Sequence, residues 1–291
     1  MPDESVQPRL DRTPRSTRTI RTRRALRPQR ASAMLRSSRL APVDILSSAV
    51  PAVADLDVII PAYNEELRIG AALEALCQQF SAQPGRIRIL VVDNNSVDST
   101  VEAVDRVRRH GVRIDIVNCR TPGKGAAVRA GVAHATAPYV AYVDADTSVP
   151  PKVLATGLAL LEHGWDGVVG SRRALGGRYA VAQPLVRRVG SRVFNLLART
   201  IVGPLSDPQC GMKMFRRDLA SDLFAESRID GFAFDVEILA RARAANLSLM
   251  ELPITWTDST GSSFAPVKHG IASFREIARV HSMTRGLSRV A

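Results

Sequence analysis

Long apolar runs are missing from this chain of 291 residues. No stretch approaches the roughly 18 to 20 consecutive apolar residues of a membrane-spanning helix, which excludes an integral membrane protein. Cysteine is also scarce, with only Cys77, Cys119 and Cys210 and no CxxC pair. So few cysteines exclude a disulfide scaffold and a structural zinc cluster, and they fit a reducing compartment.

Acidic residues are few at the start of the chain, where eleven arginines in residues 1–40 face only Asp3, Glu4 and Asp11. This segment carries +8 of the formal net charge of +12, so the body of the chain is only mildly basic. Residues 1–50 lack sustained periodicity, and we expect a disordered Arg-rich tail rather than a secretory signal. Three interpretations stay open: a basic arm that contacts anionic lipid or nucleic acid, a solvated tail, or a start codon assigned upstream of Met34.

Aromatic residues make up only 5% of the chain, and lysine supplies only four of its 40 basic side chains. Proteins that bind single-stranded nucleic acid interleave aromatics with a basic stripe, which the body of this chain lacks. An Arg-tailed nucleic-acid-binding protein is therefore a remote alternative, and no nucleic-acid partner is expected. The preference for Arg over Lys is more consistent with a GC-rich genome than with binding chemistry.

From Leu56 onward, short apolar runs alternate with amphipathic stretches. The runs predict strands at 56-LDVIIPA, 87-IRILVVD, 112-VRIDIVN, 138-PYVAYVD and 167-GVVG. Helices are expected between them, near 65–80, 98–110, 124–136 and 151–163. This order indicates an α/β domain with a mainly parallel sheet flanked by helices. Ligands bind beyond the carboxyl ends of the strands in such sheets, so polar residues there are the candidate site residues.

The second half of the chain is less regular and ends in amphipathic helices. We expect a basic amphipathic helix over 185–202, a strand at 211-GMKMF, a helix near 233–246, a strand at 247-LSLMELPI and a final helix over 266–282. Because no internal repeat or long linker interrupts the pattern, residues 55–283 are predicted to form one catalytic domain.

The string 142-YVDADTSVP places two carboxylates, Asp144 and Asp146, at the end of a buried strand. Burying two charges is costly unless something neutralises them. A divalent cation held by one or two carboxylates and substrate phosphates is the usual Mg²⁺ or Mn²⁺ arrangement. A lone DxD is more often a solvated loop, but its position on the ligand edge favours a metal site.

Three further strings fall on the same edge. In 58-VIIPAYNEE, the residues Tyr63, Asn64 and Glu65 follow a strand, where they would meet a base or cap the next helix. In 91-VVDNNSVDST, Asp93 ends the next strand and is placed to hold a ribose or base. In 121-TPGKGAAVRAG, a glycine loop carries Lys124 into a helix N-terminus, a reasonable neighbour for phosphate.

Together these strings resemble the family-2 glycosyltransferases of the GT-A fold, which show a PxYNE element, an Asp, a glycine-lysine loop and a DxD in this order. The resemblance continues in 170-GSRR, 206-SDPQCGMKMFRRD, 232-FAFDVEILARA and 251-ELPITW. These strings resemble the polyprenyl-phosphate sugar synthases, and CGMKMF looks most like the dolichyl-phosphate glucosyltransferase branch. The likeness covers about residues 56–280.

The resemblance implies a role for each matching position. It implies that the nucleotide-sugar is bound by Pro61, Ala62, Tyr63, Asn64, Glu65, Asp93, Lys124, Asp144 and Ala145. The metal, Mg²⁺ or Mn²⁺, would be held by Asp146 with Asp144.

The resemblance also implies catalytic roles in the second half, beside that of Asp146. Arg172 would clamp a phosphate, Lys213 would be a second cation for the acceptor phosphate, and Asp207 would orient the acceptor or stabilise positive charge at C1. Arg172 and Lys213 are equally well interpreted as members of surface ion pairs.

Two positions depart from the family pattern. Asn95 replaces a glycine in the turn after the second strand, and Asn is the residue that tolerates positive φ next best. Ser148 stands where the archaeal-type lipid-phosphate mannosyltransferases have a Gln, so the third metal ligand is open.

The implied reaction moves a hexose, expected to be glucose from a UDP-sugar, to polyprenyl phosphate with inversion at the anomeric carbon. GDP-mannose, UDP-N-acetylhexosamine and a soluble acceptor are the alternatives. The basic helix over 185–201 is either an interfacial helix on an anionic leaflet or an ordinary core-facing helix. We accordingly expect a cytoplasmic protein, peripheral at the inner face of the membrane, with a membrane protein as a possible partner.

Overall fold

The computed structural model describes residues 54–83, 85–107, 112–146, 148–179, 185–257 and 266–287, so the predicted tail over 1–50 lies outside the described residues. The strands are β1 (Leu56–Ala62), β2 (Ile87–Asp93), β3 (Arg113–Asn118), β4 (Tyr139–Tyr142), β5 (Gly167–Ser171), β6 (Arg178–Tyr179), β7 (Lys213–Arg216), β8 (Leu249–Pro253) and β9 (Thr255–Trp256). The helices are α1 (Ile69–Phe80), α2 (Thr100–Val107), α3 (Lys124–His134), α4 (Lys152–Glu162), α5 (Leu185–Val202), α6 (Arg217–Ala225), α7 (Phe234–Ala244) and α8 (Pro266–Leu287).

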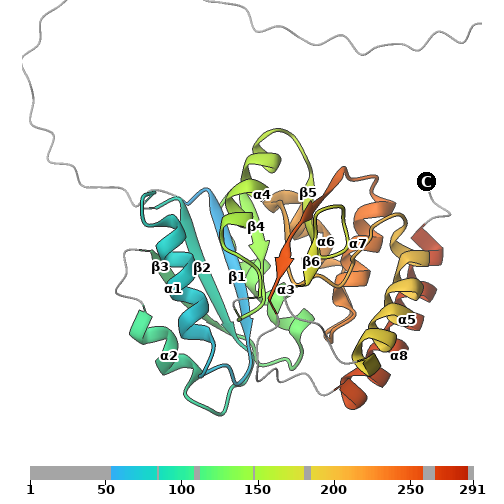
Figure 1. Cartoon of the computed structure of the whole chain (residues 1–291), viewed down its shortest axis with the longest axis horizontal. Coiled ribbons are helices and arrows are strands. Elements are labelled where there is room, and N and C mark those ends of the chain that lie inside the picture. The colour runs from blue at the N-terminus through green and yellow to red at the C-terminus, as the bar shows by residue number, and fades with distance from the viewer. Residues whose placement is uncertain are drawn as a thin grey trace, which may run out of the picture. The chain divides into compact units, whose positions relative to one another are not determined.

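Seven strands form one mixed sheet in the order β3-β2-β1-β4-β7-β5-β8 (Figure 1). The pairs β1–β2, β2–β3, β1–β4 and β5–β8 are parallel, whereas β7 runs antiparallel to both β4 and β5. The short strands β6 and β9 form a second, parallel pair. The sheet therefore has a fully parallel half, β3-β2-β1-β4, and a mixed half in which β7 runs in the opposite direction to its neighbours.

The central strands are buried on both faces of the sheet. Successive side chains of a strand point to opposite faces, and a core cluster covers each face. Val58 and Ile60 pack in one core cluster with residues of α1, α2 and α4, such as Leu73 and Leu158. Ile59 points the other way, into a second cluster formed with residues of α3, α5, α6, α7 and α8. Such near-continuous apolar strands are typical of a sheet covered by helices on both faces.

The α/β fold predicted from the sequence is confirmed, and the predicted strands lie where expected to within a few residues. The first helix begins at Ile69 rather than near residue 65, because the residues after β1 form a turn. Helix α6 and strand β6 were not predicted. No helix within the described ranges is long and apolar enough to cross a bilayer.

Candidate active site

The loops that follow β1 and β2 are hydrogen-bonded to each other through side chains. The backbone N–H of Asn64 donates to Ser96 Oγ at 3.1 Å, and Val97 N–H donates to Asn64 Oδ1 at 2.9 Å. Asn64 has a φ of 54°, a conformation that Asn adopts more readily than most residues. Tyr63, by contrast, is 50% exposed at the tip of this turn. Asn64 thus fixes the loop, while the Tyr63 ring remains accessible for stacking.

The turn after β2 brings Asp93 beside the first loop, since Asp93 is the parallel partner of Ala62. Asp93 Oδ1 accepts the N–H of Ser96 at 3.3 Å. The next residue but one, Asn95, has a φ of 65°, so the expected positive φ at this replaced glycine is confirmed.

A residue that sequence reasoning missed, Asn94, connects this turn to the glycine loop. Its side-chain amide donates to the carbonyl of Thr121 at 2.7 Å, and its Oδ1 accepts the N–H of Gly123 at 2.8 Å. Asn94 is buried, so each of these bonds is shielded from water. Its position directly after a strand-end Asp was the available signal.

The N-terminus of α3 is closed by the protein itself. The N–H groups of Gly125 and Ala126 donate to the carbonyl of Asp230, Gly125 at 2.7 Å. Gly123 has a φ of 125°, and a Cβ at that position would lie 2.2 Å from the same carbonyl oxygen. These two helix N–H groups therefore have protein partners, and the predicted phosphate contact of this loop depends on the Lys124 side chain.

The carboxylate of Asp144 lies between Lys124 and Gly211. The Lys124 ammonium forms an ion pair with Asp144 Oδ1. Burial alone would lower the pKa of Lys124, but the negative charges of Asp144, Asp235 and Asp146 outweigh it and raise that pKa. A Cβ on Gly211 would lie 2.0 Å from Asp144 Oδ2, so only glycine fits this close approach.

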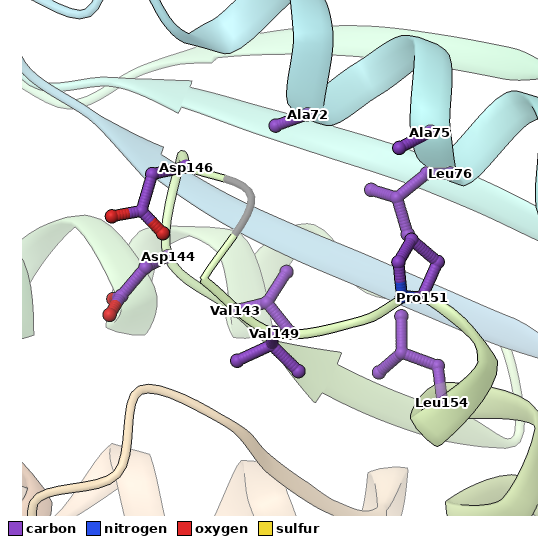
Figure 2. Close-up of a pocket in the computed structure, with 9 residues that line it drawn as sticks. All are labelled: Ala72, Ala75, Leu76, Val143, Asp144, Asp146, Val149, Pro151 and Leu154. Atoms are coloured by element: carbon purple, nitrogen blue, oxygen red, sulfur yellow. The ribbon is translucent and has the colours of Figure 1, made fainter. Parts of the chain in front are cut away.

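The second DxD carboxylate, Asp146, accepts the N–H of Ser148 at 3.0 Å. Figure 2 shows the Asp144 and Asp146 side chains directed to the same side of the loop, with the buried Ala145 between them in sequence. Both aspartates line a small pocket whose other walls are apolar residues of α1, α4 and the loop between β4 and α4, including Leu76 and Leu154.

A third carboxylate, that of Glu65, lies within electrostatic range of the pair. Burial raises the pKa of Glu65, and the negative charges of Asp146 and Asp144 raise it further. The positive charge of Arg68 and its 2.6 Å hydrogen bond to Glu65 lower the pKa but do not cancel the effect of burial. Among the described residues, no three Asp, Glu, His or Cys side chains form a metal site by themselves. Two hard oxygen donors at a strand end, with excess negative charge around them, do fit a Mg²⁺ or Mn²⁺ ion that also takes ligands from a substrate diphosphate.

Directly after β5, Arg172 forms a buried bidentate ion pair with Asp207. Arg172 Nε donates to Asp207 Oδ2 at 2.6 Å, and Nη2 donates to Oδ1 at 2.8 Å. The guanidinium also lies 5.0 Å from the centroid of the Trp256 ring. Burial would raise the pKa of Asp207, but the hydrogen bonds and charge of Arg172 hold it below its usual range. Arg172 is thus an ion-pair member, although not at the surface.

Lys213 is the first residue of β7, where it is the strand partner of Tyr142, and it has no solvent-exposed surface. Its ammonium donates to Asp235 Oδ1 at 2.5 Å and to the carbonyl of Cys210 at 2.6 Å. Asp235 Oδ1 also accepts the Tyr142 hydroxyl at 2.9 Å. Asp235 lies in the family string 232-FAFDVEILARA, but no role was predicted for it from the sequence. The contact of Lys213 with an acceptor phosphate remains a prediction, since here the ammonium faces the interior.

Glu251 positions the loop that carries Asp207. Its carboxylate accepts the N–H and hydroxyl of Ser206 at 2.8 and 2.9 Å. From the opposite side, Asn195 of α5 donates to the Ser206 carbonyl at 3.3 Å. The string 251-ELPITW was part of the family likeness, but this function of its glutamate was not predicted.

Comparisons with known proteins identify the family of this chain. The sequence profile described as Glycosyl transferase family 2 matches residues 57–224. A dolichyl-phosphate beta-glucosyltransferase of Drosophila melanogaster is 32% identical over 249 residues, which cover 78% of this chain and 76% of that protein. An uncharacterized glycosyltransferase of Mycobacterium tuberculosis is 37% identical over 204 residues, covering 70% of this chain and 86% of the relative.

Among solved structures, glucosyl-3-phosphoglycerate synthase from Mycobacterium tuberculosis, in complex with Mn²⁺, UDP and glucosyl-3-phosphoglycerate, superposes with a TM-score of 0.60 at 18% identity. The match covers 80% of each chain and establishes a shared fold. The profile match over more than half of the chain, and the relatives above 30% identity, establish the family. This chain is a glycosyltransferase of family 2 with a GT-A-like α/β fold.

Proposed function

We propose that this glycosyltransferase moves glucose from UDP-glucose to polyprenyl phosphate, with inversion at the anomeric carbon. The observation that carries the proposal is the convergence of Asp144, Asp146 and Lys124 at the end of β4, beside the interlocked loops after β1 and β2. The name of the Drosophila relative supports glucose and a lipid-phosphate acceptor.

Asp144 and Asp146 would hold Mg²⁺ or Mn²⁺, which would supply positive charge to the departing nucleoside diphosphate. The segment from Pro61 to Glu65 and Asp93 would bind the nucleotide, with the exposed Tyr63 ring stacking on the base. Lys124, already paired with Asp144, would add a second positive charge beside the diphosphate.

The acceptor phosphate is anionic at neutral pH, so the enzyme has to position and desolvate it rather than deprotonate it. We assign the acceptor side to Arg172 and Asp207, whose bidentate bonds fix the guanidinium plane. Lys213 would act indirectly in the conformation described, because its ammonium bonds to Asp235 and to the carbonyl beside Gly211.

The lipid acceptor requires a surface that meets a membrane, and we assign it to α5 and α8, which pack side by side (Figure 1). One face of α5 is buried through residues such as Phe194 and Ala198, yet Leu196 is 67% exposed and Val193 and Leu197 are also exposed. Phe274 of α8 adds a further exposed ring that contacts Phe194. Helix α5 therefore carries apolar side chains on the side that faces the core and also on the side that faces solvent.

The charge of these helices complements an anionic leaflet. The sequence of α5 contains four arginines and no acidic residue, and α8 contains a single acid, Glu276, which bonds to the protein interior. Basic helices with exposed apolar side chains bind the interface of anionic bilayers. We therefore propose a cytoplasmic enzyme that docks on the inner face of the membrane through α5 and α8.

Titration calorimetry with UDP and GDP, each with Mn²⁺, tests the donor without any lipid. We expect UDP to bind more tightly, whereas GDP binding tighter by tenfold, about 1.4 kcal/mol, would favour a mannosyltransferase.

Flotation with vesicles that contain about 30% anionic lipid tests whether α5 and α8 contact the membrane. We expect Leu196→Glu to abolish binding, whereas Leu67→Glu, at an even more exposed leucine in the loop between β1 and α1, should leave binding unchanged. Equal flotation of both variants would contradict the assignment of α5.

A further inference from the structure

The turn between α6 and α7, residues 229–233, contacts three helices at once. Its Asp230 carbonyl accepts the N–H groups of Gly125 and Ala126 at the start of α3. A Cβ on Gly125 would lie 2.4 Å from the carbonyl oxygen of Ile229, so this end of α3 is packed directly on the turn. Because Lys124 is the first residue of α3, the turn determines where its ammonium can lie.

The same turn leads into α7 and so places Asp235. Two residues after the turn, Asp235 receives hydrogen bonds from Tyr142 and Lys213. Its negative charge also acts on Lys124. Lys124, which pairs with Asp144, and Asp235, whose charge acts on Lys124, therefore both depend on this short segment.

Helix α8 contacts that segment through the carboxylate of Glu276. Glu276 Oε2 accepts the N–H of Ala233 at 3.0 Å, which satisfies one of the donors at the start of α7. A Cβ on Gly231 would lie 2.0 Å from Glu276 Oε1, so the carboxylate occupies the space that a side chain would take. The Glu276 carboxylate can therefore lie against residue 231 only because this residue is a glycine.

We propose that Glu276 is a positioning residue through which α8 fixes Lys124 and Asp235 around the DxD carboxylates. The inference rests on the proposed donor site, and it gives α8 a second task beside membrane contact. A change at Glu276, far along the sequence from every donor-binding motif, should then weaken binding of the nucleotide with its metal.

Two independent substitutions disturb this contact. Glu276→Ala removes the carboxylate, and Gly231→Ala displaces it by inserting a methyl group where the carboxylate lies. Glu162→Gln is the control, because Glu162 is a half-exposed glutamate of α4 that pairs with Arg86. The variants would be compared with the wild type by titration of UDP with Mn²⁺ and by thermal unfolding.

We expect both Glu276→Ala and Gly231→Ala to weaken UDP·Mn²⁺ binding by about tenfold, with Glu162→Gln unchanged. Glu276→Gln, which keeps an acceptor oxygen, should recover part of the affinity, a pattern that simple loss of stability would not give. Folded Glu276→Ala and Gly231→Ala proteins with wild-type affinity would overturn the inference. If the wild type itself fails to bind UDP with Mn²⁺, the proposed function fails, and the comparison among variants is then made with the nucleotide that it does bind.

Discussion

The two halves of the sheet edge use charge in different ways. In the half that we propose binds the donor (the donor half), the loops after β1, β2 and β4 hold polar side chains that bond mainly to backbone groups, and Tyr63 stays half exposed. In the half that we propose binds the acceptor (the acceptor half), around β5, β7 and β8, the charges of Asp207 and Lys213 are fully buried and paired with other side chains. Substitutions in the donor half should therefore reduce activity, whereas substitutions in the acceptor half should also reduce stability.

The largest effect is expected for Asp146→Asn, because an amide cannot replace an anionic metal ligand. Removal of one preorganised electrostatic contact costs on the order of 100-fold in turnover or more. We expect activity to fall at least that far while the thermal unfolding midpoint changes little, as measured by lipid-linked product formation and circular dichroism. Near-normal turnover by the folded variant at saturating Mn²⁺ would remove Asp146 from the metal site.

Asp207→Asn should instead lower the free energy of unfolding, because it removes the negative charge of the bidentate pair with the Arg172 guanidinium. Breaking a buried pair in this way costs about 3 kcal/mol. Urea unfolding measures the loss, with Asp93→Asn in the donor half as the comparison, for which less than about 1 kcal/mol is expected. Equal stability of the two variants would contradict the distinction between the halves.

The pH dependence of unfolding sharpens the same contrast. Arg172 holds the pKa of Asp207 below its ordinary value, so the folded state favours the ionised carboxyl. The stabilisation is fully present above the unfolded pKa of about 3.9 and is lost as the pH falls through the lower, folded pKa. The stability difference between wild type and Asp207→Asn should therefore shrink only below about pH 4. A difference that already disappears between pH 7 and 5 would assign the effect to another group.

Tyr142→Phe should have the smallest effect, because it removes only the hydroxyl that donates to Asp235 and leaves the Lys213 bond in place. A net loss of about 1 kcal/mol is typical of one such hydrogen bond. We expect this loss in urea unfolding together with a decrease in turnover of a few-fold. A stability loss as large as that of Asp207→Asn would show that the Tyr142 hydroxyl holds the whole buried cluster.

The strands and the strand-end residues of the donor half were predictable because the sequence signals for them are local. Apolar runs, strand-end carboxylates and turn residues are neighbours in sequence, so the strands, the position of the DxD and the positive φ of Asn95 could be predicted from nearby residues. Parallel strands then bring their carboxyl ends to one edge without further information.

The acceptor half was less predictable because its contacts depend on the direction in which one strand enters the sheet. Arg172 and Asp207 are 35 residues apart, and Lys213 and Asp235 are 22 apart. Their pairing depends on β7 running antiparallel between β4 and β5, which the apolar pattern does not specify. For α5, the sequence predicted an amphipathic helix with one broad apolar side, but only packing decides that Phe194 faces the core whereas Val193 and Leu197 are exposed.

The reaction itself tests the central claim most directly. Purified protein would be incubated with polyprenyl phosphate, Mn²⁺ and radiolabelled UDP-glucose, GDP-mannose or UDP-N-acetylglucosamine in parallel, with Asp146→Asn as the inactive control. We expect label to enter the lipid fraction from UDP-glucose alone and only with the wild-type chain. Absence of lipid-linked product, with sugar transferred instead to a soluble acceptor, would contradict the assignment of a polyprenyl-phosphate glucosyltransferase.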